Sequence, residues 1–255
     1  MAELIIENGD CLELMKKLPD KSIDLFICDL PYGETNCKWD SVIDMEEFWK
    51  QFKRLRKSKH VACIHFCSTK FGYTLIKSWE SGFKMDMVWK KRNKTGGLQS
   101  RHRPMRNHEM VYFFYEQAPK YNRDKYHKRI ETKEEHNPEP VIEEDEDPNV
   151  NEDGKSAHGW DIKHMNKPRV ASFEPVLPTA IFESTKFFGK RHHQTEKPLD
   201  ILEFFLKYWS DENDTILDPT MGSGSTGVAC KKLNRKFIGY EMDEKIFEIA
   251  KKRLE

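Results

Sequence analysis

A glycine-rich loop between a strand and a helix, close to the end of the sequence, limits the folds open to this chain. Residues 214–241 read DTILDPTMGSGSTGVACKKLNRKFIGYE and are predicted to form strand, loop, helix and strand. Gly222, Gly224 and Gly227 fit G-x-G-x-x-G in that context, and Glu241 closes the second strand. The glycines let a ligand approach the backbone, and the carboxylate can accept from both hydroxyls of a ribose. The pattern predicts a site for a ligand that contains ribose.

The same segment distinguishes between the candidate nucleotide-binding folds. A triphosphate-binding loop needs G-x-x-x-x-G-K-[ST], and no lysine follows Gly227 in this loop. A dinucleotide fold stays open, but its nucleotide-binding unit normally begins a sheet whose other strands come later in the chain. Here the sequence ends one helix after Glu241. We therefore expect the other strands to come from the N-terminal half, as in a doubly wound sheet with permuted order.

The N-terminal half has the alternation that such a sheet needs. Short runs rich in branched and aromatic residues alternate with segments of helical periodicity, which is typical of a mostly parallel α/β sheet with helices on both faces. In the helix expected at 44–57, the side chains of Met45, Phe48, Phe52 and Leu55 lie on one side. The expected strands are residues 4–8, 22–28, 60–67, 83–91 and 108–116, and the expected helices are residues 10–18, 44–57, 69–81 and, in the C-terminal half, 197–210.

Charge and cysteine content set weaker limits. The 255 residues include 43 Lys and Arg and 43 Asp and Glu, so net charge alone indicates no class of partner. The six cysteines show no disulfide framework, and there is no signal peptide or apolar run long enough to span a bilayer. We expect a reduced, cytoplasmic protein that does not enter a membrane.

One segment, HVACIHFC at residues 60–67, contains potential metal ligands. On a strand, Cys63, His65 and Cys67 share one face at steps of about 6.6 Å. Donor atoms on one tetrahedral zinc lie about 4 Å apart, which is too close for Cys63 and Cys67 on a straight strand. The segment is interpreted as core packing, and no metal is expected.

Two motifs in a fixed order carry a family resemblance. The sequence DLPY, residues 29–32, follows the buried run SIDLFIC, and DPTMGSGST follows at residues 218–226. This order resembles the beta class of S-adenosylmethionine-dependent DNA amino methyltransferases, particularly the adenine-N6 enzymes of phages and prokaryotes. The likeness covers about the first 116 residues and those from about His192 to the end. It implies a Rossmann-like methyltransferase sheet, S-adenosylmethionine as cofactor and double-stranded DNA as substrate.

The resemblance assigns cofactor-binding residues. Asp10 and Cys11, in NGDCLELMKKL, would lie near the adenine of the cofactor, and Lys197, in TEKP, near its methionine end. Asp218 would face the methionine moiety, and Glu241 would take the ribose with Met242 beside it. The full predicted cofactor set is Asp10, Cys11, Asp29, Lys197, Asp218, Thr220, Gly222, Ser223, Gly224, Ser225, Glu241 and Met242.

The resemblance also assigns the catalytic residues Asp29, Leu30, Pro31 and Tyr32. The exocyclic amine of adenine is a poor nucleophile because its lone pair is delocalised. If the Asp29 carboxylate and the Leu30 carbonyl accept its protons, the nitrogen can aim its lone pair at a methyl group. Tyr32 would stack on the base, which must first be flipped out of the duplex. Leu30 stands where the family usually has proline; the carbonyl is kept, but the loop is less rigid.

Several alternatives stay open at this point. A cytosine-N4 enzyme of the same family needs the same chemistry, although Asp rather than Ser at position 29 favours adenine. RNA methylation, a catalytically silent nucleic-acid-binding partner and a nicotinamide oxidoreductase are further alternatives. Ring-carbon methylation of cytosine lacks its nucleophile, because the chain contains no Pro-Cys pair.

The central region lacks sustained periodicity. We expect a catalytic half at residues 1–116, a target-recognition insertion at 117–191 with an acidic, disordered stretch at 131–153, and a cofactor-binding half at 192–255. Basic clusters suggest DNA contacts by Arg101, Arg103 and Arg106, and the loop after the DLPY motif offers Lys38 and Trp39. A homodimer is compatible with the sequence, which does not determine the oligomeric state.

Overall fold

The computed structural model describes residues 3–34, 41–130, 172–184 and 196–255. The chain divides into two compact units. The first unit combines Met1–Asn122 with Pro178–Glu255, and the second is Arg123–Leu177. The first unit thus joins two segments that the sequence separates.

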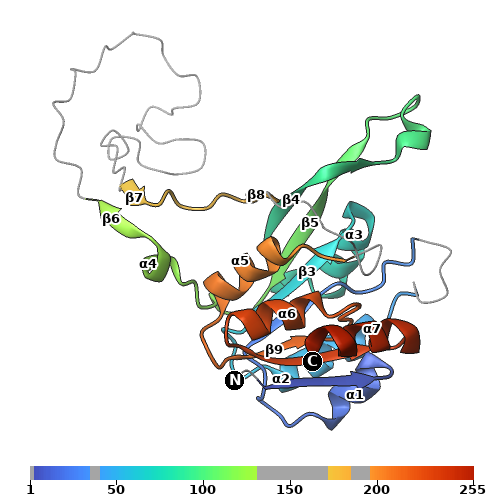
Figure 1. Cartoon of the computed structure of the whole chain (residues 1–255), viewed down its shortest axis with the longest axis vertical. Helices are drawn as coiled ribbons and strands as arrows, with labels where there is room; N and C mark the ends of the chain where they lie inside the picture. Colours follow the sequence, from blue (N-terminus) through green and yellow to red (C-terminus); the bar gives the residue numbers. More distant parts are fainter. Residues whose placement is uncertain (1–2, 35–40, 131–171, 185–195) are drawn as a thin grey trace, which may run out of the picture. The chain divides into compact units, whose positions relative to one another are not determined.

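An eight-stranded sheet forms the centre of the first unit (Figure 1). Its neighbours pair in parallel, except that β5 runs antiparallel to both β3 and β4. The prediction of a mostly parallel sheet is therefore confirmed. In spatial order the strands are β1 (Leu4–Asn8), β10 (Lys236–Glu241), β9 (Thr215–Asp218), β2 (Leu25–Cys28), β3 (Cys63–Cys67), β5 (Arg106–Phe114), β4 (Phe83–Thr95) and β8 (Ile181–Glu183).

The C-terminal strands lie between N-terminal ones, as the permuted order requires. Strand β9 pairs with β2, with Phe26 opposite Leu217, and β10 pairs with β1, with Ile5 opposite Ile238. Because β2 and β9 are parallel neighbours, the loops that follow Cys28 and Asp218 leave the same edge of the sheet. Ligands of doubly wound sheets bind at such carboxyl ends.

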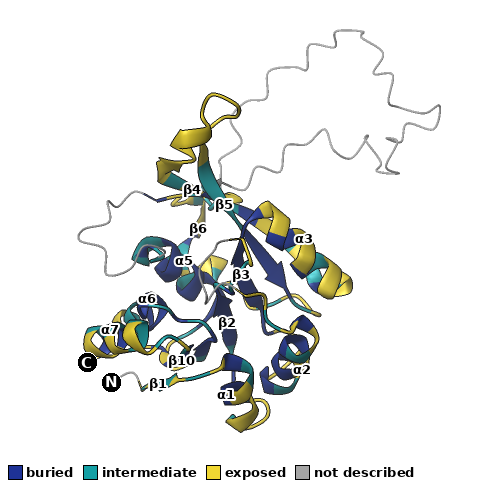
Figure 2. Cartoon of the chain, turned by 90° about the vertical axis from the view of Figure 1, so that its right-hand side faces the viewer, coloured by how far each residue is buried: buried dark blue, intermediate teal, exposed yellow. Residues whose placement is uncertain are grey.

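Two layers of helices cover the sheet. Helices α1, α2 and α3 lie on one face and α5, α6 and α7 on the other, each with its buried side toward the strands (Figure 2). Side chains of Asp10, Asp44, Ser68 and Asp243 accept hydrogen bonds from the first turns of α1, α2, α3 and α7. The bounds are α1 (Cys11–Lys17), α2 (Met45–Leu55), α3 (Thr69–Ser78), α5 (Leu199–Trp209), α6 (Ser225–Lys232) and α7 (Glu244–Leu254), with short 3₁₀ turns η1 (Glu80–Gly82) and η2 (Gly97–Gln99).

The core follows the hydrophobic pattern of the sequence. Every residue of β2 and β3 is buried, as expected for strands covered on both faces. In α2 the predicted side of Met45, Phe48, Phe52 and Leu55 is the buried side. Helix α5 (Leu199–Trp209) lies within the predicted residues 197–210, and Pro198 occupies its N-cap position.

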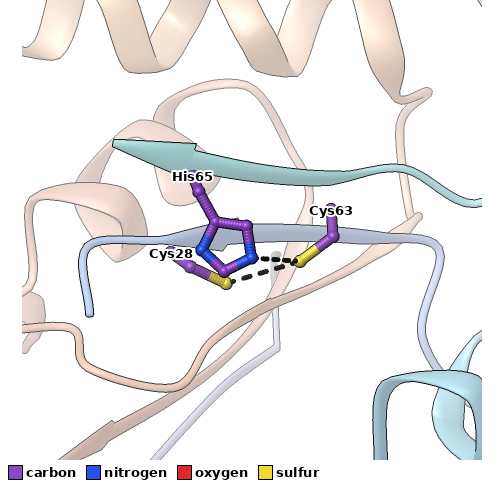
Figure 3. A group of neighbouring side chains, drawn as sticks. All are labelled: Cys28, Cys63 and His65. Atoms are coloured by element: carbon purple, nitrogen blue, oxygen red, sulfur yellow. Dashed lines mark hydrogen bonds between the residues drawn. The ribbon is translucent and has the colours of Figure 1, made fainter. Parts of the chain in front are cut away.

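A small polar cluster lies inside this core (Figure 3). Cys63 and His65, both on β3, meet Cys28 of the neighbouring strand β2. The Sγ atoms of Cys28 and Cys63 are 3.8 Å apart, and Cys63 Sγ lies 3.2 Å from His65 Nε2. The predicted burial of the HVACIHFC side chains is confirmed for Cys63, His65 and Cys67. The contribution of Cys28 was missed, because it comes from another strand. Three ligand atoms converge among the described residues, one fewer than a structural zinc site uses.

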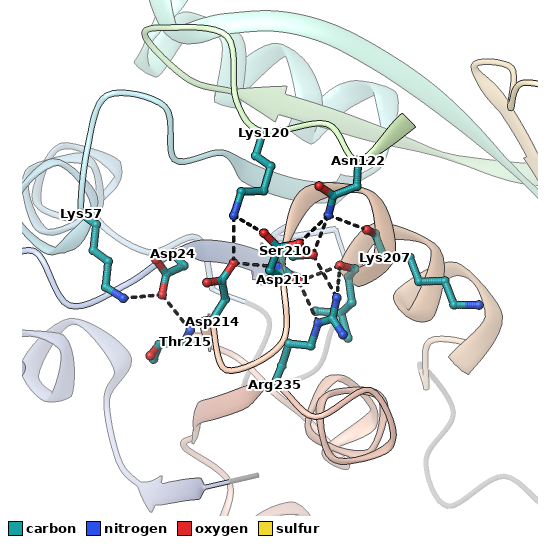
Figure 4. A network of polar contacts seen from close by, with 11 residues as sticks. Asp24, Lys57, Lys120, Asn122, Lys207, Ser210, Asp211, Asp214, Thr215 and Arg235 are labelled. Carbon is teal, nitrogen blue, oxygen red and sulfur yellow. Dashed lines mark hydrogen bonds and ion pairs between the residues drawn. The ribbon is translucent and has the colours of Figure 1, made fainter. Parts of the chain in front are cut away.

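A polar network joins the N-terminal and C-terminal segments of the first unit (Figure 4). Asn122 Nδ2 donates to the carbonyl oxygens of Lys207 and Ser210, at 3.0 and 2.9 Å. The buried guanidinium of Arg235 donates to the Ser210 carbonyl at 2.9 Å from the other side. Asp24 accepts from Thr215 N at 2.8 Å. These bonds fix the end of α5 and the start of β9 against the N-terminal strands.

Between β4 and β5 the chain forms a hairpin, since no α-helix crosses over between them and the two strands run antiparallel. Its tip, including η2, is exposed (Figure 2). The smaller unit contains α4 (Arg123–Tyr126) and an antiparallel pair of strands, β6 (Lys128–Ile130) and β7 (Ser172–Glu174). The acidic stretch at 131–153 lies outside the described residues. Among the residues that are described, none belongs to a helix that could cross a bilayer.

The network predicts that Asn122→Ala destabilises the fold. The substitution removes the hydrogen bonds that Asn122 donates to the carbonyls of Lys207 and Ser210. The free energy of unfolding should therefore fall by about 1–3 kcal/mol. Urea denaturation measures the change. Lys120→Ala removes the neighbouring ion pair between Lys120 and Asp211. Because the side chain of Lys120 is 49% exposed, this substitution should lower the free energy of unfolding by less than about 1 kcal/mol. Equal losses in the two variants would contradict this role of Asn122.

Candidate active site

A cavity of about 510 Å³ opens at the carboxyl ends of the central strands. It is lined by residues from both segments of the first unit, and most of the predicted site residues meet there. Gly224 does not line it. The predicted residues in its wall are Asp10, Cys11, Asp29, Leu30, Pro31, Tyr32, Lys197, Asp218, Thr220, Gly222, Ser223, Ser225, Glu241 and Met242.

The glycine loop gives the cavity one wall. Gly222 and Gly224 have φ of 52° and 79°, in the left-handed region that glycine tolerates best. Gly227 allows α6 to pack closely on β10, because a Cβ there would lie 2.8 Å from the ring of Phe237. Gly224 therefore shapes the turn without facing the cavity, and the three glycines of the motif hold the backbone where a ligand can approach it.

Glu241, at the end of β10, has its carboxylate fixed by the backbone. Its Oε2 accepts from Gly222 N at 3.1 Å and its Oε1 from Asp243 N at 2.8 Å. Burial raises the pKa of this carboxyl, and the two main-chain bonds oppose the rise. A carboxylate has about four acceptor sites, so hydroxyl donors of a ligand can still bind both oxygens.

Asp218, at the end of β9, is a buried carboxyl. Burial raises its pKa to about 7, although hydrogen bonds from Thr226 Oγ1 at 2.6 Å and Thr220 N at 3.1 Å oppose the rise. Asp29 and Glu241 raise it further through their charges. A ligand with positive charge would relieve this accumulation of carboxylates.

Asp29, directly after β2, is held from three directions. Tyr32 Oη donates to its Oδ1 at 2.8 Å, and Lys197 Nζ donates to its Oδ2. Thr220 Oγ1 donates to its main-chain carbonyl at 3.0 Å, so the glycine loop and the DLPY segment are tied together. The ring of Tyr32 stacks on Phe71 with centroids 5.1 Å apart. Both carboxylate oxygens of Asp29 thus have a protein donor.

Lys197 bridges two acids. Besides its contact with Asp29, its Nζ lies 3.8 Å from Glu109 Oε2 on β5, and Glu109 Oε1 lies 2.7 Å from Lys91 Nζ. Burial opposes the charge of Lys197, but Asp29 and Glu109 outweigh it and hold its pKa above the usual value. The family resemblance implies that Lys197 lies near the methionine end of the cofactor; the structure places its ammonium on Asp29, within the same cavity.

Two further residues, Glu109 and Arg253, contribute to the site and were not predicted. Glu109 was expected only as a strand residue, yet it lines the cavity. Arg253, on the last helix, pairs with Glu196 at 2.5 Å and donates to the carbonyl of Ser223 at 3.2 Å. It also reaches Ser225 Oγ at 3.1 Å. An acid within the apolar strand β5 was the one available signal; nothing in the sequence singled out Arg253.

The predicted nucleic-acid contacts lie elsewhere. Arg101, Arg103 and Arg106 are exposed on the β4–β5 hairpin and do not line the cavity. At the base of the hairpin, Lys91, Arg92, Asn93 and Thr95 do line it. The hairpin therefore runs from the cavity wall to an exposed basic tip. Lys38 and Trp39 lie outside the described residues.

Comparison with known proteins agrees with this arrangement. A family model described as DNA methylase, for N6 and N4 methyltransferases, matches residues 23–252. The chain is 25% identical to the type II methyltransferase M.HinfI of Haemophilus influenzae, over 98% of this chain and 67% of that protein. It is 28% identical to the type II methyltransferase M2.LlaDCHI of Lactococcus lactis subsp. cremoris, over 98% of this chain and 88% of that protein.

Solved structures share the fold. The crystal structure of an M1.HpyAVI–SAM complex superposes with a TM-score of 0.61 at 23% identity, covering 98% of this chain and 100% of that one. The PvuII DNA methyltransferase, described as cytosine-N4-specific, superposes with a TM-score of 0.67 at 15% identity, covering 100% of this chain and 87% of that one.

The raised pKa of Asp218 predicts a pH-dependent stability. In the folded state the pKa of the Asp218 carboxyl is about 7, above its ordinary value of 3.8, so the folded protein binds a proton there more tightly than the unfolded chain does. The contribution of Asp218 to stability is therefore largest at low pH and falls as pH rises from about 4 to about 7. Urea denaturation across this range should show wild type losing stability relative to Asp218→Asn as pH rises. A difference that stays constant with pH would contradict the assignment.

Proposed function

Because the chain belongs to the N6/N4 DNA methylase family, we propose that it transfers a methyl group from S-adenosylmethionine to the N6 amine of adenine in double-stranded DNA. The observation that carries the proposal is the meeting of two sequence motifs in one cavity. Asp29 and Tyr32 line that cavity together with Gly222 and Glu241. A methyl donor and a flipped base can then be held side by side.

The residues of the cavity fit S-adenosylmethionine as the cofactor. Glu241 retains acceptor sites for the ribose hydroxyls, and Asp218 offers a buried carboxyl to a positively charged methionine end. Asp10 and Cys11 line the same cavity at the start of α1, where the adenine would lie. When bound, the cofactor supplies an electrophilic methyl group. The solved M1.HpyAVI complex, of the same fold, holds SAM.

The DLPY segment would activate the target amine. The Asp29 carboxylate and the Leu30 carbonyl accept its two protons, so that its lone pair turns toward the methyl group. Leu30 is 1% exposed, and this packing fixes the loop where the family usually has a proline ring. Tyr32, backed by Phe71, would hold the flipped base by stacking.

The choice of adenine rests on Asp at position 29. The fold does not decide the base, since the PvuII enzyme with the same fold is described as cytosine-N4-specific. Transfer to cytosine N4 is therefore the second candidate, with the same residues in the same roles.

The β4–β5 hairpin would contact DNA. From Lys90 to Arg106 it carries seven Lys and Arg and no Asp or Glu, and it starts at the cavity wall. Arg101, Arg103 and Arg106 are the proposed phosphate contacts. We assign target recognition to residues 117–191, which include the smaller unit at Arg123–Leu177.

The direct test is transfer of labelled methyl from S-adenosylmethionine to mixed-sequence duplex DNA by the wild type and by Asp29→Asn. The variant keeps the shape of the side chain but lacks the carboxylate charge, so transfer should slow by about 10²-fold or more. Calorimetry should show cofactor affinity within a few fold of wild type, because Asp29 acts on the amine. Wild-type protein that binds cofactor but labels no DNA would overturn the proposal.

The hairpin assignment predicts a change in the salt dependence of DNA binding. Each lost phosphate contact should reduce the slope of log K against log salt by about 1, so Arg101→Ala with Arg103→Ala should lower it by about 2. Fluorescence anisotropy with duplex DNA at several salt concentrations measures the slope. Lys16→Ala, an exposed lysine on α1, is the matched control. A double variant with the wild-type slope would remove the hairpin from the interface.

A further inference from the structure

We propose that Glu109 is a positioning residue that receives the ammonium of Lys197 when the target amine reaches Asp29. The inference rests on the function proposed above. It adds to the site a residue that does not touch the methyl group or the amine, and that acts through Lys197. It also gives Lys197 a role between two acids.

The Asp29 carboxylate is already occupied by protein donors, and the movement of Lys197 would free one of its oxygens. Lys197 donates to Asp29 Oδ2, and Tyr32 donates to Oδ1 at 2.8 Å. An ammonium on the carboxylate takes up much of the negative charge that an incoming amine proton would otherwise meet. Asp29 is therefore a weaker acceptor in this state than its proposed role requires, and Lys197 must withdraw from it.

Glu109 offers the place to which Lys197 can withdraw. Its Oε1 is used by Lys91 at 2.7 Å, whereas its Oε2 is buried and has no hydrogen-bond partner among the described residues. Lys197 Nζ already lies 3.8 Å from that Oε2. A shift of about 1 Å would bring the two atoms to a charge-assisted hydrogen-bond distance of about 2.8 Å. A buried carboxylate oxygen without a donor is costly, so the contact would satisfy a group that is now unsatisfied.

The surroundings keep the ammonium charged along this path. Asp29, Lys197, Glu109 and Lys91 form a row of alternating charges, so the move changes one ion pair for another and leaves the total charge unaltered. The side chain of Lys197 is 12% exposed, which limits screening by solvent. Its Nζ lies 5.1 Å from the centroid of the Phe66 ring, and this aromatic face borders the ammonium.

Two alternative positions of Lys197 during the reaction would give different experimental results. If Lys197 stays on Asp29, Glu109 serves only to hold Lys91 and the strand. If Lys197 moves instead to the carboxylate of the cofactor, its loss changes cofactor affinity and Glu109 has no part in the transfer step. The three cases are separated by measuring cofactor affinity and methyl transfer independently.

The test combines Glu109→Gln with Lys197→Met in a double-mutant cycle. Glu109→Gln keeps the shape of the side chain and removes its charge, so the rate of single-turnover methyl transfer should fall by about tenfold or more. Calorimetric affinity for S-adenosylmethionine should stay within about twofold to threefold of wild type. In the Lys197→Met background, Glu109→Gln should change the transfer rate little, because this background has no Lys197 ammonium for Glu109 to bind.

Glu183→Gln is the matched control, since Glu183 also pairs with a lysine of β4 but is 63% exposed. It should leave transfer unchanged. Thermal melting checks that each variant is folded. If Glu109→Gln does not fold, Glu109→Asp replaces it, because aspartate keeps the carboxylate but is shorter by one methylene and holds it farther from Lys197.

The proposal is overturned by a Glu109→Gln rate equal to that of wild type, or by an equal loss with and without Lys197. A matching loss of cofactor affinity would assign Lys197 to the cofactor instead. If the wild type itself transfers no methyl group to DNA, the proposed function fails, and the inference about Glu109 fails with it.

Discussion

The parallel pairing of β2 and β9 is the interaction on which the rest of the site depends. These strands are far apart in the sequence, and their register places Phe26 opposite Leu217. The loop after β2 carries Asp29 and the loop after β9 carries the glycines. Thr220 then joins the two loops through the Asp29 carbonyl. Without this pairing, the DLPY motif and the glycine loop would have no common cavity.

Among the described residues that line the cavity, acids outnumber the lysines and arginines. Asp29, Asp218, Glu241 and Glu109 all line it, and burial raises the pKa of Asp218 and Glu241. A cofactor with a positively charged centre would lower this cost, whereas an anionic nucleotide would add to it. The same accumulation explains why Lys197 is held between two carboxylates.

Much of the fold could be predicted, because it follows from local patterns. Helix periodicity marked the buried side of α2, and the glycine motif marked the loop after β9. What the sequence did not show were contacts made across the sheet or between distant segments. Lys197 and Asp29 are 168 residues apart, and Cys28 joins Cys63 only because their strands are neighbours. Arg253 gave no signal, since its partners, Glu196 and Ser223, become neighbours only after folding.

The identity of the methylated nucleoside is the most direct test of the proposed reaction. Duplex DNA would be incubated with the protein and S-adenosylmethionine, digested to nucleosides and analysed by mass spectrometry. We expect N6-methyladenine, made only when both the protein and the cofactor are present. N4-methylcytosine would keep the roles of Asp29 and Tyr32 but contradict adenine as the target base, and the absence of any methylated base would contradict the proposed methyl transfer to DNA.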